Sequence, residues 1–356
     1  MKKLLLIILL ICNFMLAEQL VKILPYKSNE FSPALKQSFQ IPFELKQEAN
    51  ITINIYTPDN NLIRSLIKSN VKKGKNFLKW DGKDFKGTIV PDEAYNIVLI
   101  AKSKNKKEVI DPRLTGGFVI KNLERKIDKR GNIRYKLPSP ARVLIRAGIE
   151  NSCMLKVISN WAPKNKGLVL QKWNMKDSNE VIDISKLNFA VSISAFELPK
   201  YAIITTNNKQ KDYLNYFKEN NFKCNSIPIK QQILKRENRG ISTHFYKCRI
   251  EERDPKLNII FPNKKKLNEI PVIKENESII IKITTNSDDE KLLEKVKYEI
   301  SFFIDFQFTS EEELGYIPIL WNFKPFGLKK GEHILTVNIT SFNGQVGVES
   351  IKFLLE

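Results

Sequence analysis

The chain has 356 residues, enough for two or three domains, and its 59 lysines and arginines against 39 acidic residues give a formal net charge of +20. Its two histidines, His244 and His333, lie far apart in the sequence, which excludes a histidine-rich zinc site, and neither lies near a nucleophile-elbow pattern. So basic a surface attracts polyanions, which outside the cytoplasm are lipid phosphates, lipopolysaccharide or wall polymers.

The first residues, MKKLLLIILLICNFMLAEQ, have the pattern of a secretory signal peptide. Two lysines precede the apolar run Leu4–Cys12, and Met-Leu-Ala at 15–17 forms a cleavage site. No later segment is apolar for long enough to span a bilayer. We therefore expect residues 1–17 to be removed and the protein to be extracytoplasmic, in the periplasm, in the outer envelope or secreted. Cys12 also allows a lipoprotein interpretation, although Leu10-Ile11 stand where a lipobox has small residues.

A repeat follows. Residues 41–55, IPFELKQEANITINI, match residues 133–147, IRYKLPSPARVLIRA, and one inserted residue later WDGKD at 80–84 matches WNMKD at 173–177. NITINIYT and YNIVLIAK alternate apolar and polar residues, which indicates strands with one buried face. The strands are separated by Asn, Gly, Pro and Asp, which favours β-sandwiches over βαβ units.

Six residues define the fold of this repeat in our interpretation: Trp80, Asp81, Gly82, Asp84, Pro91 and Trp173. The tryptophans are expected in the core at a strand end, Asp-Gly supplies turn geometry, and the proline begins the next strand. Asp81, Asp84 and Asp92 also suggest a calcium site, but the second copy keeps only Asp177 of this set. Turn chemistry is therefore preferred, and no metal, cofactor or catalytic residue is predicted.

The residues that carry a family resemblance are Phe31, Ser32, Pro33, Ile55, Tyr56, Gly74, Trp80, Asp81, Gly82, Asp84, Gly87, Val90, Pro91 and Tyr95. Residues 30–104 thereby resemble the immunoglobulin-like (Ig-like) module of FlgD-type flagellar hook-capping proteins, with Glu93 at a position where that pattern usually has glycine. Residues 120–206 resemble the same module less closely. The resemblance implies an Ig-like sandwich and says little about activity, because such modules are appended to many secreted proteins. A hook-capping role is disfavoured, because those proteins leave by flagellar export without a cleaved signal and carry a hook-anchoring region not found here.

Residues 256–356 resemble a bacterial Ig-like domain of another type. Leu335, Val337 and Ile339 form the apolar face of a long strand, and Asn343-Gly344 predicts the hairpin that follows it. His333 is interpreted as a turn residue. A capping-box spacing beginning at Ser287 predicts a short helix.

Residues 207–255 match neither module and are expected to form a small αβ connector. NNKQKDYLNYFKENNF has apolar residues at helical spacing, and STHFYKCRI is predicted to be a strand. Three cysteines remain after signal cleavage, an odd number. Cys224 and Cys248 are the expected disulfide pair, which leaves Cys153 as a lone thiol.

Two basic runs flank the junction of the first two modules. We expect them to meet at an inter-domain seam facing a polyanion, although a solvated face is the simpler interpretation of any one run. The aromatic residues nearby have no stacking pattern, so nucleic acid is not a predicted partner. The residues are Lys102, Lys104, Lys106, Lys107, Arg125, Lys126, Lys129, Arg130 and Arg134.

The sequence thus predicts a mainly β protein of tandem Ig-like β-sandwich domains with a small αβ connector. The preferred function is non-catalytic: an envelope-associated structural, adhesion or scaffold protein that binds an envelope protein or an anionic cell-envelope polymer. Two alternatives stay open. A carbohydrate-binding accessory protein would need an exposed aromatic, for which Trp161 is the best candidate. An enzyme would have its site within 207–250, where Cys224, His244 and Cys248 gather.

Overall fold

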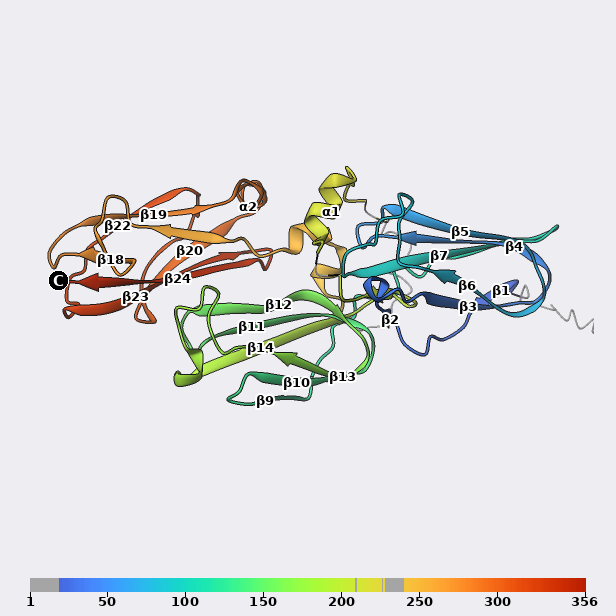
Figure 1. The fold of residues 1–356 in the computed structure, drawn as a ribbon, viewed down its shortest axis with the longest axis horizontal. Helices are drawn as coiled ribbons and strands as arrows, with labels where there is room; N and C mark the ends of the chain where they lie inside the picture. The colour runs from blue at the N-terminus through green and yellow to red at the C-terminus, as the bar shows by residue number, and fades with distance from the viewer. Residues whose placement is uncertain (1–18, 209, 226, 228–239) are drawn as a thin grey trace, which may run out of the picture.

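Three β-sandwich modules are arranged around a central connector (Figure 1). The computed structural model describes residues 19–208, 210–225, 227 and 240–356. The predicted mainly β fold of tandem sandwiches is confirmed. Residues 1–17, predicted to be a signal sequence, lie outside the described residues, and within these no helix has the length and apolar character needed to cross a membrane.

The first module packs a sheet of order β1-β3-β6 against one of order β2-β15-β7-β4-β5, with β8 paired to β7. Alternation along β4 places Ile51, Ile53 and Ile55 in the core with no exposed surface. Its elements are β1 (Val21–Ile23), β2 (Glu30–Phe31), η1 (Pro33–Leu35), β3 (Phe39–Leu45), β4 (Ala49–Tyr56), β5 (Leu62–Val71), β6 (Gly74–Trp80), β7 (Ala94–Lys102) and β8 (Lys107–Ile110).

The second module packs a sheet of order β13-β10-β9 against one of order β12-β11-β14. One strand within the range expected for this module belongs elsewhere: β15 (Ile203–Thr205) pairs with β7 and β2, so it extends a sheet of the first module. The module's own elements are β9 (Arg125–Ile127), β10 (Asn132–Leu137), β11 (Ala141–Ile149), β12 (Met154–Lys164), β13 (Gly167–Lys172), η2 (Ile184–Lys186) and β14 (Phe189–Glu197).

The sequence repeat is also a repeat of hydrogen bonds. Trp80 is buried, and its indole Nε1 donates to the carbonyl of Lys83 at 3.0 Å. Trp173 occupies the same place in the second module and donates to the carbonyl of Lys176 at 2.8 Å. In both copies the turn after the tryptophan brings the side-chain oxygen of an aspartate, Asp84 or Asp177, to backbone N–H groups.

The third module packs a sheet of order β16-β19-β22 against one of order β17-β18-β24-β23-β20-β21. Leu335, Val337 and Ile339 lie in its core, and the Asn343-Gly344 turn joins β23 to β24, as predicted. Its elements are β16 (Leu257–Ile260), β17 (Lys266–Leu267), β18 (Ile270–Ile273), β19 (Ile279–Thr285), α2 (Ser287–Leu293), β20 (Tyr298–Ile304), β21 (Gln307–Glu312), β22 (Ile319–Phe323), β23 (Gly331–Ser341) and β24 (Val346–Leu355).

Two local predictions for this module were wrong. His333 is not a turn residue: it lies on β23, and its Nδ1 is 2.6 Å from a carboxylate oxygen of Asp305. The predicted short helix is present as α2, but its cap is Asn286 and not Ser287: the side chain of Asn286 accepts from the N–H groups of Asp288 and Asp289.

In the part of the connector that the structure describes lie α1 (Tyr213–Glu219) and the 3-10 helices η5 (Thr243–Tyr246) and η6 (Arg249–Glu252). The helix was predicted, but the strand expected over STHFYKCRI was wrong, because that segment forms η5 and η6. A disulfide joins Cys224 to Cys248 and so ties the end of the α1 region to the short helices, whereas Cys153 is a buried free thiol.

The second and third modules contact each other directly. The side-chain oxygen of Asn338, on β23, accepts from the N–H of Met154 at 2.8 Å, and its amide donates to the carbonyl of Met154 at 2.9 Å. On the second module's β11, Arg146 donates to the carbonyl of Gly344 at 2.6 Å. One face of β23 therefore packs in the third module's core while polar residues on the other face meet the second module.

Candidate functional site

Three charged side chains that are buried or largely buried lie together where the connector meets the first two modules. Glu93 precedes β7, is 1% exposed, and forms ion pairs with Arg142 of β11 at 2.7 Å and Arg249 of η6 at 2.8 Å. Burial alone would raise the pKa of Glu93, but the two guanidinium groups outweigh it and lower that pKa below its ordinary value. Glu93 therefore stays ionised, and its two oxygens hold two elements that lie far apart in the sequence.

A β-bulge supplies the remaining partners of the two arginines. In the β11–β12 register Val143 faces Ala162 and Ile145 faces Ser159, so Asn160 and Trp161 together lie opposite Leu144. Their carbonyls accept from the arginines: Arg249 donates to Asn160 and Arg142 donates to Trp161, both at 3.1 Å. These bonds satisfy guanidinium protons that the single carboxylate cannot reach.

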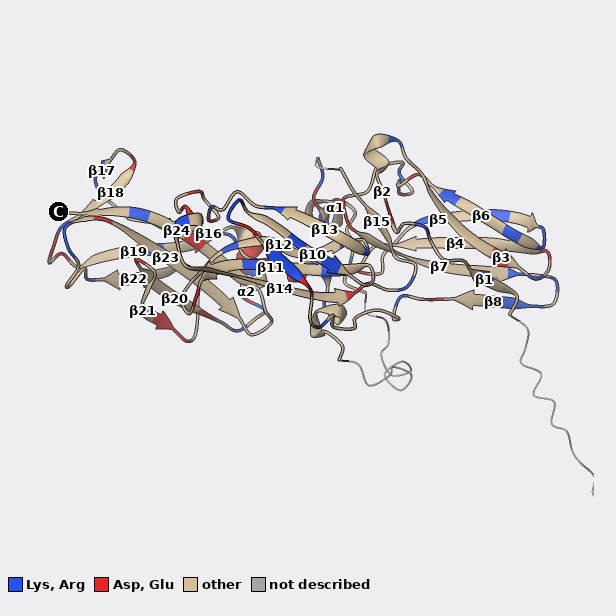
Figure 2. Cartoon of the chain, turned by 90° about the horizontal axis from the view of Figure 1, so that it is seen from below, with Lys and Arg blue, Asp and Glu red and all other residues tan. Residues whose placement is uncertain are grey.

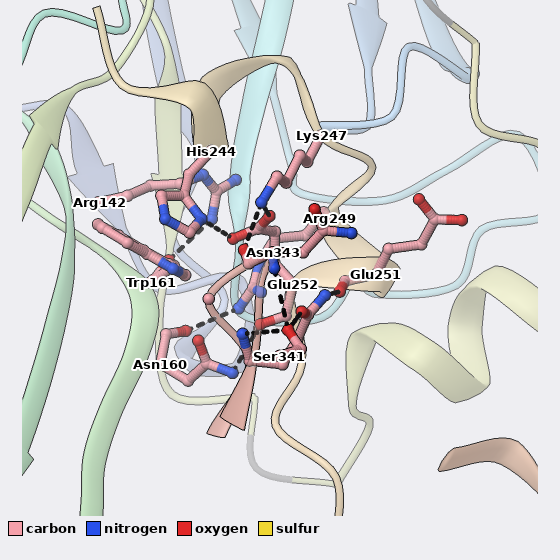
Figure 3. A network of polar contacts seen from close by, with 12 residues as sticks. Arg142, Asn160, Trp161, His244, Lys247, Arg249, Glu251, Glu252, Ser341 and Asn343 are labelled. Atoms are coloured by element: carbon pink, nitrogen blue, oxygen red, sulfur yellow. Dashed lines mark hydrogen bonds and ion pairs between the residues drawn. The ribbon is translucent and has the colours of Figure 1, made fainter. Parts of the chain in front are cut away.

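Residues 244–252 of the connector also contact the third module. As Figure 3 shows, His244, Lys247 and Glu252 lie together, with His244 Nδ1 2.5 Å from a Glu252 oxygen and Lys247 Nζ 3.7 Å from the other. Lys247 also donates to the carbonyl of Asn343, in the β23–β24 turn. Gln345 donates to the carbonyl of Glu251 at 2.6 Å. One short stretch of chain thus contacts all three modules.

A cavity of about 440 Å³ adjoins this network. Its wall is mixed, with aromatic, charged and disulfide groups; among the lining residues are Asp59, Arg113, Phe196, His244, Tyr246 and Cys248. Burial raises the pKa of Asp59 to about 6, although its carboxylate accepts from the N–H of Arg249 and the hydroxyl of Tyr213. The cavity is lined by groups that already bind one another, so the arrangement is suited to holding modules together.

The aspartates considered for calcium bind backbone groups instead. Asp81 accepts from the N–H of Lys83 at 3.1 Å, and Asp92 accepts from the N–H of Asn208 at 2.9 Å. Asp84 accepts from two N–H groups of its own turn and from the hydroxyl of Tyr216. Over the described ranges, no three or more His, Cys, Asp or Glu side chains are grouped so that they could hold a metal ion.

The two basic runs do not meet at a seam. Lys102, which ends β7, pairs with Asn50, whereas the start of β7 pairs with β15 beside the connector. The Lys102–Lys107 hairpin therefore lies at the end of the first module away from the second. Arg125, Lys126 and Arg134 lie on the β9–β10 pair of the second module, and Figure 2 shows β10 near the middle of the molecule, apart from β8 at its right-hand end. Lys129 and Arg130 are exposed in the turn between them.

Trp161, the best candidate for an exposed sugar-binding aromatic, is only 5% exposed. Its ring packs against Phe196 and, at 4.4 Å between centroids, against His244. Its φ of +45° belongs to the bulge that positions the carbonyl for Arg142. Trp161 therefore does not supply the exposed aromatic that the carbohydrate-binding alternative needs.

Sequence reasoning missed the Glu93 network, although one signal pointed to it. Glu93 was the position that departed from the glycine of the FlgD-type pattern, and the departure marks the carboxylate that receives Arg142 and Arg249. Neither arginine stood out in the sequence, because the ion pair between Glu93 and Arg249 joins residues 156 positions apart.

The comparisons with known proteins are partial. The chain is 34% identical over 70 residues to the basal-body rod modification protein FlgD of Salmonella typhimurium, and equally to that of Salmonella typhi; the match covers 19% of this chain and 30% of each relative. The chain thus spans less than a third of the length of the curated relatives it matches. No family model matches.

Three solved structures show weak similarity. FlgD from P. aeruginosa is 20% identical, with 26% of this chain and 70% of that chain covered and a TM-score of 0.22. A tetra-tandem repeat from the extending region of a large adhesion protein is 9% identical, with 94% and 73% covered and a TM-score of 0.21. Trypsin-activated α2-macroglobulin from Escherichia coli is 9% identical, with 94% and 23% covered and a TM-score of 0.19. These values carry no argument about function.

Proposed function

We propose that this chain is a non-catalytic scaffold of the extracytoplasmic envelope, which holds three β-sandwich modules in a fixed arrangement and binds envelope proteins or anionic polymers. The observation that carries the proposal is the connector, where residues 244–252 bind all three modules through Glu93, Asn160 and Asn343. A protein whose modules acted independently would not need buried charged groups at their junction, because burying charges is costly unless every one is paired.

The chemistry of the junction supports a structural role. Both sulfurs of Cys224 and Cys248 are in the disulfide, so neither is available as a thiolate nucleophile. Glu93 is paired with both Arg142 and Arg249, and each arginine also donates to a backbone carbonyl. The enzyme alternative keeps one feature, the His244–Glu252 pair beside the cavity, but that imidazole also packs on Trp161.

The test is co-sedimentation of the chain from Glu18 to Glu356 with isolated envelopes, over a series of salt concentrations. Binding that weakens steeply with salt supports an anionic polymer as partner, because screening weakens contacts between exposed charges. Binding that is insensitive to salt supports a protein partner. Absence of binding at low salt would overturn the envelope role, and the fixed arrangement would then stand only as a description of the fold.

A matched variant separates the scaffold from the binding surface. Arg249→Gln removes the connector's charge from Glu93 while changing the net charge by only one unit. If the fixed arrangement matters, this variant becomes more flexible in small-angle X-ray scattering and loses affinity for envelopes. Lys256→Gln, at an exposed lysine, changes the charge equally but leaves the contacts to Glu93 and Asn343 in place, and it should keep the wild-type scattering profile.

A further inference from the structure

Lysines from three separate loops converge at the end of the first module farthest from the connector. The pairs Leu45–Gly74, Ala49–Val71 and Asn50–Lys102 place the β3–β4, β5–β6 and β7–β8 loops at one tip. Figure 2 shows basic residues along β5, β6 and β8 at this end. We call these eight residues the lysine tip: Lys46, Lys72, Lys73, Lys75, Lys102, Lys104, Lys106 and Lys107.

The tip is strongly positive because few carboxylates accompany it. The three segments 44–48, 72–75 and 102–108 contain eight lysines and three glutamates, Glu44, Glu48 and Glu108. Glu48 is paired with Lys72 at 2.6 Å, and Glu108 accepts from the N–H of Leu20 at 2.5 Å. Seven of the eight lysines are exposed, all but the half-buried Lys106. The excess charge therefore faces solvent, where it attracts anions within about 10 Å at ordinary ionic strength.

The chain enters the fold at this same tip. Val21 of β1 pairs with Leu45, beside the β3–β4 loop, and the N–H of Leu20 binds Glu108. The apolar run Leu4–Cys12 ends seven residues before Gln19, the first described residue. A fully extended chain of that length reaches at most about 25 Å. While residues 1–17 are still attached, a membrane that contains the apolar run therefore lies close to the lysine tip.

We propose that the lysine tip is a docking surface for the anionic headgroups of a lipid bilayer. The inference rests on the proposed envelope role and names the polyanion. After cleavage the tip remains where the chain left the membrane, and each of its exposed lysines is attracted to an anionic headgroup surface by about 1 kcal/mol. The first module lies at one end of the elongated molecule (Figure 1), so docking through the tip directs the third module away from the membrane.

The test uses the chain from Glu18 to Glu356 with sedimented vesicles, either of phosphatidylcholine alone or with about one third phosphatidylglycerol. Each lysine near an anionic surface raises the partition coefficient roughly fivefold. Replacing Lys73, Lys75 and Lys104 by Gln should therefore lower binding to the anionic vesicles on the order of a hundredfold. The matched control replaces Lys265, Lys324 and Lys330, exposed lysines of the third module, by Gln and should change binding by less than about threefold.

The outcomes are distinguishable. Equal binding of the tip variant and the control variant to anionic vesicles would overturn the proposal, as would equal binding of the wild type to neutral and anionic vesicles. If the wild type binds purified wall polymer but not anionic vesicles, the lipid proposal fails while the proposed envelope role stands. Failure of that role appears separately, as absence of binding to isolated envelopes. Thermal unfolding of both triple variants should match the wild type, because all six side chains are exposed.

Discussion

Arg249 of the connector donates from Nε to Glu93 of the first module at 2.8 Å, and both side chains are largely withdrawn from solvent. Because the same carboxylate also receives Arg142 of the second module, one residue links the connector to two sandwiches. The contact is thus a point where loss of one side chain should affect more than one module.

Glu93→Gln should lower the free energy of unfolding by about 3–5 kcal/mol, because it leaves the buried guanidinium of Arg142 and the partly buried one of Arg249 facing a neutral amide. The measurement is urea denaturation followed by tryptophan fluorescence. Glu48→Gln removes an exposed partner of Lys72 and serves as the control, for which a loss of less than about 1 kcal/mol is expected. Equal losses in the two variants would contradict the role given to Glu93.

Replacing both Cys224 and Cys248 by serine should cost roughly 3 kcal/mol, because the disulfide closes a loop with a sequence separation of 24 and so restricts the unfolded chain. A reducing agent should lower the melting temperature of the wild type and leave that of the double variant unchanged. Cys153→Ala, at a buried free thiol, should keep the response to reductant. A double variant that still responds would show that the bond does not stabilise the fold.

Gly82→Ala and Gly87→Ala test the turn after Trp80. Both glycines have positive φ, +74° and +78°, so alanine at either position should cost about 1 kcal/mol. A Cβ at Gly82 would also lie 2.2 Å from Cγ of Pro33, whereas one at Gly87 meets open space. Gly82→Ala should therefore cost about 1–3 kcal/mol more than Gly87→Ala, measured by thermal unfolding. Similar melting temperatures for the two variants would contradict this packing.

Stability should depend on the protonation of Asp59. Burial raises its pKa from 3.8 to about 6, so between these values the folded protein binds a proton that the unfolded chain has released. The resulting stabilisation is complete below about pH 4 and is lost as the pH rises through 6. Compared with Asp59→Asn, the wild type should lose on the order of 3 kcal/mol across this window. Parallel stability profiles of the two proteins would contradict the shifted pKa.

The sequence alone predicted the features that depend on local residue patterns. Alternation in NITINIYT and the match of WDGKD to WNMKD predicted the sandwiches and the buried tryptophans, because local period and turn chemistry decide both. STHFYKCRI also alternates, yet it forms 3-10 helices. Alternation specifies a strand only where a partner strand is available, and partners are set by tertiary structure.

Predicting the candidate sites would have required long-range contacts, which the sequence does not show. The lysine run at 102–107 was visible in the sequence. The strand pairings that bring Lys46 and Lys72–Lys75 beside this run were not visible, and neither was the distance between the run and Arg125. Thr336 and Asn338 alternate with the apolar residues of β23, and the structure buries both, with Asn338 bound to Met154 of the second module. A sequence pattern distinguishes apolar from polar faces but does not identify which module covers the polar one.

Strand β15 carries a consequence for the order in which this chain can fold. It follows the entire second module, yet it lies between β2 and β7, and Ile203 is part of the first module's core. A chain that emerges from a membrane amino end first therefore cannot complete its first sandwich until residue 205 has passed through. The whole second module therefore precedes the last strand of the first sandwich along the chain. A truncation just before residue 203 would leave β2 and β7 without the strand between them.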